Sequence, residues 1–322
     1  MQLRSVCLAT ICFILLTGTL IAQNKEEQAE KELLSLSVDL GVLLVKSTST
    51  LDTHGEERIS DNTKEGDSPA SVWTLPLFDL RYRFEDTHTQ VFFGTPIEGS
   101  NIALALGVVQ PIPGTGILSL SVAPSLGSEV WKNPYQENVK RQRTAADLLT
   151  TTLKLDHVGF SPVNLELIHR SVDVDQDEIG ELYSGLKRDG TIQRLKTSYD
   201  IGLSKTSLFS PGILMEEGDF AGESNSYHRR GLVLSYKKKS SGYLVVLEAT
   251  GSHAQFESEH PIYNKTREED AFNWFALLRV LEPFAIESMH ANIVLGGGSV
   301  DASIDFFDSD TCYAALTLGY SF

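Results

Sequence analysis

The sequence predicts an all-β protein, specifically a transmembrane antiparallel β-barrel with up-and-down topology. Apolar side chains recur at every second position, and no run of about 18 apolar residues follows residue 22. Polar connections between these runs also alternate between long and short. A soluble β-sandwich would show the same alternation of side chains, but its loops would show no systematic difference in length. The pattern therefore favours a barrel.

The N-terminal segment has the features of a secretory signal peptide. Residues 1–4 supply a short basic start, residues 6–22 form an apolar run broken only by Thr and Gly, and a polar stretch follows. We expect cleavage after Ala22, a polar segment over residues 23–33, and one barrel domain over residues 34–322. An uncleaved anchor is the alternative, but the run is slightly short for a span of about 20 apolar residues.

The alternating runs predict the strands of the barrel. Candidate runs begin near Leu34, Val72, Thr89, Asn101, Gly116, Ala145, Val163, Thr191, Pro211, Tyr227, Tyr243, Ala271, Ala291 and Thr311. These starts predict an even number of about 14 strands. The runs at Thr89 and Pro211 are weak, and Gly296–Gly298 would weaken or bulge its strand. A barrel of about 12 strands is therefore the alternative.

The connections predict which end of the barrel faces outward. Long polar connections are expected at 50–71, 128–145, 176–190 and 259–270, and short turns near 86–89, 111–115, 159–162, 206–209, 239–242 and 283–289. Short periplasmic turns and longer outer loops are the usual anatomy of a transmembrane barrel. Both termini are then expected on the periplasmic side.

The last eleven residues strengthen this interpretation. Apolar or aromatic side chains alternate from Cys312 to Phe322, and the chain stops on an aromatic residue. Such a strand resembles the closing strand of bacterial outer-membrane barrels. The resemblance implies that Tyr320 and Phe322 form part of a signal read by the barrel-assembly machinery, and that the protein resides in the outer membrane of a Gram-negative bacterium.

Composition excludes several other classes of function. The chain has 43 acidic and 27 basic residues and a formal net charge of −16, which makes it a poor binder of nucleic acid. After removal of residues 1–22, Cys312 is the only cysteine, so no intramolecular disulfide can form. Its position on an apolar strand face predicts a small buried side chain rather than a nucleophile.

Charged residues on the faces opposite the apolar side chains predict the lining of the barrel. A charge on the lipid face would cost about 2–4 kcal/mol near the membrane midplane, so these residues are expected to point inward. The residues expected to line a pore are Arg81, Arg83, Arg194, Lys196, Asp200 and Arg279. The predicted function is a passive pore for small polar solutes or ions. The alternative is a barrel closed by its own ion pairs or by an inward-folded loop, with a structural, surface-binding or lipid-interacting role.

The outer loops contain residues suited to binding other molecules, but no catalytic motif. Sequence motifs for a nucleophile elbow, a zinc site, a redox pair or a phosphate loop are lacking, so we expect no enzymatic activity, cofactor or metal centre. Acidic residues crowd three expected outer loops, which could share bridging divalent cations with outer-membrane lipids and lipopolysaccharide, or could simply form a solvated, repulsive rim. They are Asp52, Glu56, Glu57, Asp61, Glu65, Asp67, Glu216, Glu217, Asp219, Glu223, Asp301, Asp305, Asp308 and Asp310.

One expected loop is basic. The stretch from Val130 to Arg143 carries Trp131 and Tyr135 beside four basic residues. This composition makes it the best candidate for contact with sugar or phosphate, or for folding into an acidic lumen.

Several segments spread over the chain resemble one known family. They are Pro76–Phe84, Phe92–Pro96, Val130–Tyr135, Asn264–Phe272 and the final strand. With these segments the chain is similar to the bacterial outer-membrane-like proteins catalogued as the domain of unknown function 2860 family. The resemblance implies a barrel and an outer-membrane location, and it implies no particular activity.

Overall fold

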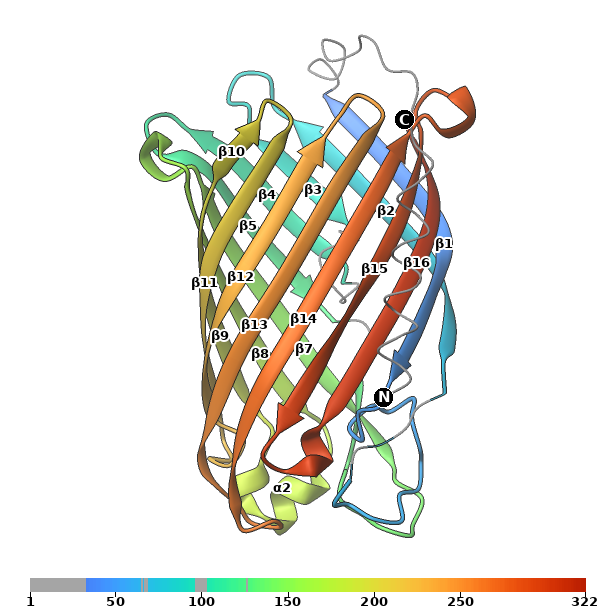
Figure 1. The fold of residues 1–322 in the computed structure, drawn as a ribbon, viewed down its shortest axis with the longest axis vertical. Helices are drawn as coiled ribbons and strands as arrows, with labels where there is room; N and C mark the ends of the chain where they lie inside the picture. Colours follow the sequence, from blue (N-terminus) through green and yellow to red (C-terminus); the bar gives the residue numbers. More distant parts are fainter. Residues whose placement is uncertain (1–32, 65, 67–68, 96–102, 126) are drawn as a thin grey trace.

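The computed structural model describes residues 33–64, 66, 69–95, 103–125 and 127–322. Within it the chain forms a closed antiparallel barrel of 14 strands, in which each strand pairs with its neighbours in sequence and the last strand pairs with the first (Figure 1). The strands are β1 (Leu34–Ser47), β2 (Ser71–Arg83), β3 (Gln90–Gly94), β4 (Ala105–Ile112), β5 (Gly116–Pro124), β6 (Glu129–Trp131), β7 (Arg143–Asp156), β8 (Val163–Val174), β9 (Gly190–Tyr199), β10 (Ile201–Ser204), β11 (Ser207–Phe220), β12 (Tyr227–Lys239), β13 (Tyr243–His260), β14 (Lys265–Leu281), β15 (Met289–Ala302) and β16 (Ser309–Ser321).

Two of these strands do not count as separate strands of the barrel wall. β9 and β10 together form one wall strand that is interrupted at Asp200, because both pair with β11. β6 pairs only with the start of β7 and lies off the main path. The prediction of 14 strands is thus confirmed, and the alternative of about 12 is wrong.

Helical elements are short and lie in the connections. They are α2 (Glu178–Leu182) and the 3-10 turns η1 (Val158–Phe160), η2 (Ser184–Leu186), η3 (Pro283–Ala285) and η4 (Asp305–Phe307). Among the described residues, no helix combines the length and the apolar character needed to cross a membrane. The predicted cleavage after Ala22 and nearly all of the polar segment 23–33 lie outside the described residues.

The two ends of the barrel differ as the sequence predicted. One end, which we call the turn end, carries the short connections 84–89, 113–115, 157–162, 205–206, 240–242 and 282–288 together with the C-terminus (Figure 1). The other, which we call the loop end, carries the long connections after β1, β5 and β8. Because longer loops face outward in transmembrane barrels, we expect the loop end to lie outside the cell.

The expected long connection at 259–270 is wrong. β13 continues to His260 and β14 begins at Lys265, so only residues 261–264 form the turn. In this stretch the polarity of the two strand faces is reversed. Ala254 and Phe256 point into the barrel and are buried, whereas His253 and Gln255 point outward and are exposed. Beyond the membrane a barrel wall has water outside, so the apolar residues turn inward and the lipid-facing pattern disappears.

The expected bulge at Gly296–Gly298 is also wrong. β15 keeps a continuous register with both β14 and β16 through the three glycines. A Cβ at Gly296 would lie 2.2 Å from the Tyr313 ring, and one at Gly298 would lie 2.2 Å from the Asn273 amide oxygen. The glycines therefore leave room for large inward-facing neighbours.

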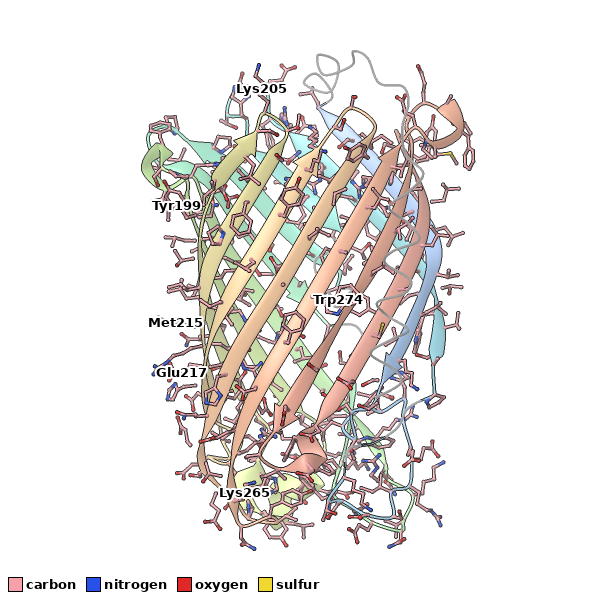
Figure 2. The ribbon with its side chains drawn as sticks, in the orientation of Figure 1. Tyr199, Lys205, Met215, Glu217, Lys265 and Trp274 are labelled. Carbon is pink, nitrogen blue, oxygen red and sulfur yellow. The ribbon has the colours of Figure 1, made fainter. Side chains whose placement is uncertain are left out.

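The exterior of the barrel is an apolar belt. Leu40 and Leu232 each expose 66% of their surface, and aliphatic or aromatic side chains occupy the outward positions of strands all round the barrel. In Figure 2, Tyr199 and Met215 project from the edge of the barrel, and Glu217 follows Met215 toward the loop end. So much exposed apolar surface is incompatible with a water-soluble monomer and fits a wall that faces lipid.

The seam between β1 and β16 closes the barrel, and Gly41 allows the two strands to approach closely there. Gly41 pairs with Thr317, and a Cβ at Gly41 would lie 2.1 Å from the Leu316 carbonyl oxygen. Tyr320 and Phe322 lie at the turn end of this seam with their ring centroids 4.9 Å apart, and the Phe322 amide donates to the Leu36 carbonyl. Their role as an assembly signal stays a prediction.

Replacing Gly41 by alanine is expected to impair barrel closure, because the obstructing atoms belong to the backbone of β16 and cannot rotate away. Overpacking of this kind costs about 1–3 kcal/mol. Heat-modifiable mobility on gels would measure the folded fraction. Gly202→Ala is the matched control, since a Cβ there meets nothing within 4 Å. Equal folded fractions for the two variants would contradict the close approach at the seam.

Candidate functional site

A ladder of charged side chains lines the inner face of the barrel on β8 to β14. Register places Arg194, Glu216 and Arg229 side by side on β9, β11 and β12, and Glu269 follows on β14. Arg194 pairs with Glu216, and the Arg229 Nη2 atom lies 2.9 Å from Glu269 Oε2. We call Arg170, Arg194, Glu216, Arg229, Arg267 and Glu269 the arginine ladder. It holds more guanidinium groups than carboxylates.

Two aromatic contacts fix the loop-end part of the ladder. The Tyr227 hydroxyl donates to Glu216 at 2.8 Å, which completes the buried environment of that carboxylate. The Arg267 guanidinium lies between the rings of Phe256 and Phe307, at 3.6 and 3.9 Å from their centroids. Stacking on two rings holds a cation in a partly desolvated place.

The sequence prediction recovered only part of the ladder. Arg194 was expected to point inward, but Glu216 was assigned to an acidic outer loop. The structure corrects this, because Glu216 lies within β11 and its side chain is 2% exposed against Arg194 and Arg229. Inward Leu214 and Gly218 alternate with outward Met215 and Glu217, so both faces of this strand mix polar and apolar residues and the period of two is hidden.

A second inward-facing cluster lies near the turn end. Lys154 pairs with Glu166 at 3.3 Å, and Lys196 pairs with Glu248 at 2.8 Å. The Ser210 hydroxyl donates to Asp200 at 2.6 Å. These side chains border a cavity of about 380 Å³. Lys196 and Asp200, two residues predicted to line a pore, therefore lie together on this wall.

A buried polar cluster lies on the inner face near the seam. The Asp39 carboxylate accepts hydrogen bonds from His290 at 3.0 Å, Asn292 at 2.8 Å and Thr317 at 3.1 Å. Asn292 in turn accepts from Arg279 Nε at 2.7 Å. The predicted residue Arg279 is thus part of a hydrogen-bonded cluster, which leaves it less free to attract a solute than a solvated side chain.

Arg81 and Arg83 lie on β2. Arg81 makes a bidentate pair with Asp79, with both N to O distances 2.7 Å, and its guanidinium lies 5.6 Å from the Phe92 ring centroid. Arg83 is the last residue of β2, at the turn end. In sheet order β2 and β9 are far apart, so the structure spreads the predicted residues around the wall instead of gathering them at one constriction. That they line a conducting pore stays a prediction.

The loop end is covered by packed connections. We call residues 48–64, 127–142, 175–189, 261–264 and 303–308 the lid. The segment 127–142 follows β5, and in sheet order it lies across the barrel from the hairpin of β13 and β14, with β8, β9, β11 and β12 between them on one side. Nevertheless the Tyr135 hydroxyl lies 3.0 Å from His260 Nε2, so this segment crosses the mouth.

The lid has an apolar and aromatic core of its own. Ile59, Ile304, Phe306 and Phe307 are buried in one cluster, and Tyr135 packs against it with its ring 4.9 Å from that of Phe306. Phe306 is 0% exposed. Buried aromatic packing of this kind gives the lid a definite structure, in contrast to loops that extend into solvent.

Two arginines, one buried and one half-buried, tie the lid together through backbone carbonyls. Arg141 is 2% exposed, stacks 4.3 Å over the Trp131 ring, and donates to the carbonyls of Thr50 and Pro134. Arg188 donates to the Trp131 carbonyl at 2.7 Å and pairs with Asp177. Trp131 is 1% exposed because it packs among these connections at the mouth, and the two roles expected for the basic loop stay predictions.

Burial in the lid shifts the pKa values of two of its side chains, His260 and Tyr135. Burial lowers the pKa of His260 to about 4, with a smaller contribution from the positive charge of Arg267. Burial raises the pKa of Tyr135 to about 12. The Ile262 amide can only donate, so its bond to His260 Nδ1 makes that nitrogen the acceptor and leaves Nε2–H to donate to Tyr135. His260 is therefore neutral at pH 7.

The expected divalent-cation contacts remain a prediction. In the part of the chain that the structure describes, no group of three or more His, Cys, Asp or Glu residues is placed to hold a metal ion. Asp301 and Asp310 lie on β15 and β16, whereas Asp305 and Asp308 lie in the connection between these strands.

Several solved structures have a similar overall shape. A bacterial polysaccharide outer membrane secretin matches with a TM-score of 0.45 and 8% identity over 88% of this chain and 98% of that chain. The outer membrane channel DcaP of Acinetobacter baumannii matches with a TM-score of 0.42 and 9% identity over 90% of this chain and 97% of that chain. No curated protein matches in sequence.

The closure of the strands and the apolar belt establish an outer-membrane-type β-barrel on their own. The family comparison agrees with the resemblance carried by the segments around Pro76, Val130 and Asn264. The model of one family matches residues 34–321, nearly the whole barrel. The chain belongs to that family, described as protein of unknown function (DUF2860).

Proposed function

We propose that this barrel is an outer-membrane pore for small polar solutes or ions, and that the lid is its gate. The observation that carries the proposal is the arginine ladder on the inner face. Charged side chains that face a lumen require water or counter-ions beside them, whereas a barrel that serves only as a packed support is better filled by apolar side chains. The cavity among Lys196, Asp200 and Glu248 supports the same reading.

The inner wall differs in charge from the rest of the chain. Basic inward side chains outnumber acidic ones on the strands that the structure describes, although the whole chain carries a net charge of −16. The basic ones are Arg81, Arg83, Lys154, Arg170, Arg194, Lys196, Arg229, Lys237, Lys239, Arg267 and Arg279, and the acidic ones are Asp39, Asp79, Asp156, Glu166, Glu216, Glu248 and Glu269, with Asp200 between β9 and β10. A pore lined in this way favours anions.

The lid supports a second candidate. A mouth crossed by Tyr135 and sealed by a buried aromatic cluster also fits a permanently closed barrel with a structural or surface-binding role. The two candidates differ in whether the lid opens. A variant that weakens the lid without touching the inner wall therefore separates them.

The test is single-channel recording of the refolded protein in a planar bilayer, with Tyr135→Ala to weaken the lid. We expect rare openings for the wild type, frequent ones for Tyr135→Ala, and preference for chloride over potassium in both. Arg81→Glu combined with Arg83→Glu is expected to shift the preference toward cations several-fold, because these side chains line the turn-end part of the wall.

Lys205→Glu is the matched control for that charge reversal. Lys205 lies in the turn between β10 and β11, so its replacement reverses one surface charge, half of the charge change in the double variant, and leaves the inner wall intact (Figure 2). Silence from both the wild type and Tyr135→Ala, in protein shown to be inserted and heat-modifiable, would refute the pore and favour the closed barrel.

A further inference from the structure

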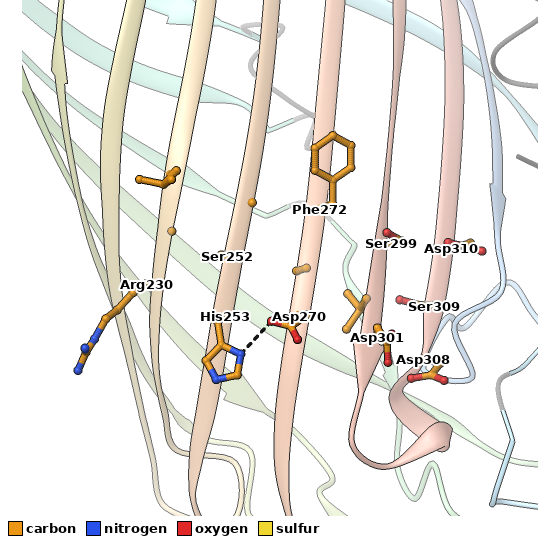
Figure 3. Close-up of a pocket in the computed structure, with 15 residues that line it drawn as sticks. Arg230, Ser252, His253, Asp270, Phe272, Ser299, Asp301, Asp308, Ser309 and Asp310 are labelled. Atoms are coloured by element: carbon orange, nitrogen blue, oxygen red, sulfur yellow. Dashed lines mark hydrogen bonds and ion pairs between the residues drawn. The ribbon is translucent and has the colours of Figure 1, made fainter.

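A shallow groove lies on the outside of the barrel, on β12 to β16, where the apolar belt ends (Figure 3). Register aligns Arg230, His253, Asp270 and Asp301 in one outward row. The next outward row toward the turn end contains Leu232, Gly251 and Phe272. The first row is polar. The second is apolar or small from Leu232 to Phe272, and it continues through Ser299 to the charged Asp310 on β16. The groove therefore lies at the expected boundary between the acyl chains and the headgroups on the loop side.

The floor of the groove is an open trough above Gly251. A Cβ at Gly251 would meet nothing within 4 Å, whereas its two neighbours in the row, Leu232 and Phe272, are 66% and 51% exposed. These two side chains stand one strand to either side, so the trough is about 10 Å wide at a strand spacing of about 4.8 Å. Ala249 continues it toward the turn end. A trough with apolar walls and a glycine floor fits an acyl chain.

The polar row provides a cationic and an anionic part. Arg230 makes no ion pair with any residue that the structure describes, and its side chain extends outward on the side of β12 away from His253 (Figure 3). His253 pairs with Asp270 at 2.9 Å. Across the Phe272 ridge lie Asp301, Asp308 and Asp310. Partial burial raises the pKa of Asp308, and the neighbouring carboxylates raise it further. That side of the groove therefore favours a bound cation.

The size of the groove argues for a large lipid. Its volume is about 880 Å³, and its lining extends from β12 to β16. Four strand spacings correspond to about 19 Å along the wall. A headgroup that reaches from Arg230 to Asp310 must be broad, must carry phosphate at the arginine side, and must tolerate a shared divalent cation at the aspartate side.

We propose that this groove binds a phosphorylated, multiply acylated glycolipid of the outer leaflet, the lipid A part of lipopolysaccharide. One acyl chain lies over Gly251 between Leu232 and Phe272. A phosphate contacts Arg230 and His253, and Mg²⁺ joins a second phosphate to Asp301 and Asp310. The proposal is independent of whether the barrel conducts, because every residue involved faces away from the lumen.

The experiment measures binding of purified lipid A to the full-length mature barrel, refolded in detergent free of lipopolysaccharide, by native mass spectrometry with Mg²⁺ present. We expect Arg230→Glu and Gly251→Leu each to weaken binding about tenfold or more, and chelation of Mg²⁺ to weaken it in the wild type. Gly251→Leu places its side chain in open space, so the barrel is expected to fold.

The control is Gly202→Leu, the same replacement at another glycine with open space around its Cβ but outside the groove. Lipid A binding by this variant is expected to equal that of the wild type. Unchanged binding in both groove variants would overturn the site. Equally tight binding of phosphatidylethanolamine or phosphatidylglycerol would overturn the assignment to lipid A. Planar-bilayer conductance of Arg230→Glu is expected to be unaffected, which separates this test from that of the pore.

Discussion

Lowering the pH from 7.5 to 4.5 is expected to open the lid, because His260 is buried in its neutral form. His260 is 1% exposed, and Nε2–H donates to Tyr135 across the mouth while Nδ1 accepts from the Ile262 amide. Protonation of Nδ1 turns the second bond into a clash of two N–H groups. It also adds a positive charge near Arg267. The Arg267 guanidinium stacks on the Phe307 ring, and that ring contacts the ring of His260.

The direction and size of the effect follow from the pKa. The pKa of His260 is lowered to about 4 in the lid, against 6.5 when the ring is in water. The contribution of His260 to the closed lid is therefore complete above pH 6.5 and is lost as the pH falls toward 4. A difference of about 2.5 pKa units corresponds to about 3 kcal/mol, or on the order of a hundredfold in the ratio of open to closed lids. The other groups facing the ring, Tyr135 and Tyr263, have raised pKa values and stay protonated over this range.

Proteolysis of folded protein in detergent would measure the opening, with a protease active at acid pH and cleavage sites in residues 127–142 as the readout. We expect much faster cleavage at pH 4.5 than at pH 7.5. His260→Gln, which cannot gain a proton, should lose most of this pH dependence. His253→Gln is the control, because His253 lies on the outer wall and is exposed. If the lid of the wild type resists proteolysis equally at both pH values, the buried neutral histidine does not hold the lid closed.

Replacing Asp39 by alanine is expected to destabilise the barrel by about 3–5 kcal/mol. One carboxylate oxygen accepts from His290, Asn292 and Thr317, which lie on β15 and β16, while Asp39 itself lies on β1. Asn292 is 0% exposed and Thr317 is 1% exposed, so water cannot replace the lost acceptor. Removal of the carboxylate takes away the acceptor of all three groups at the seam that closes the barrel, and only Asn292 Nδ2 keeps another bond, to the Thr317 hydroxyl at 2.8 Å.

Urea unfolding in detergent micelles, followed by tryptophan fluorescence and heat-modifiable mobility, would measure this loss. The graded control is Ser37→Ala, which removes only a 3.4 Å bond from the Ser37 hydroxyl to the other carboxylate oxygen. We expect a shift of the unfolding midpoint that is several times larger for Asp39→Ala than for Ser37→Ala. Similar midpoints would show that the cluster does not hold the seam.

Local chemistry alone was enough to predict the barrel wall. Where one strand face meets lipid, as for Val38, Leu40 and Val42, the period of two is clear and the strand starts are recovered within a few residues. The inward charges Arg194, Lys196 and Asp200 follow from the same pattern, since they occupy the opposite face. The alternation weakens in the membrane-distal half of β13 and along β11, and there the sequence misassigned residues 259–270 and Glu216.

Only the tertiary structure decided which residues meet across the mouth and where a groove forms on the outer wall. Tyr135 and His260 are far apart in sequence, and nothing in their local composition indicates that they meet across the barrel. The groove above Gly251 likewise arises from the register of β12, β13 and β14, which aligns one glycine with two large neighbours. The sequence by itself determined the wall, because successive side chains of a strand point alternately to the lipid and to the lumen, and each environment selects its own residue types. Contacts between loops and between distant strands depend on barrel closure and register, which no single stretch of sequence contains.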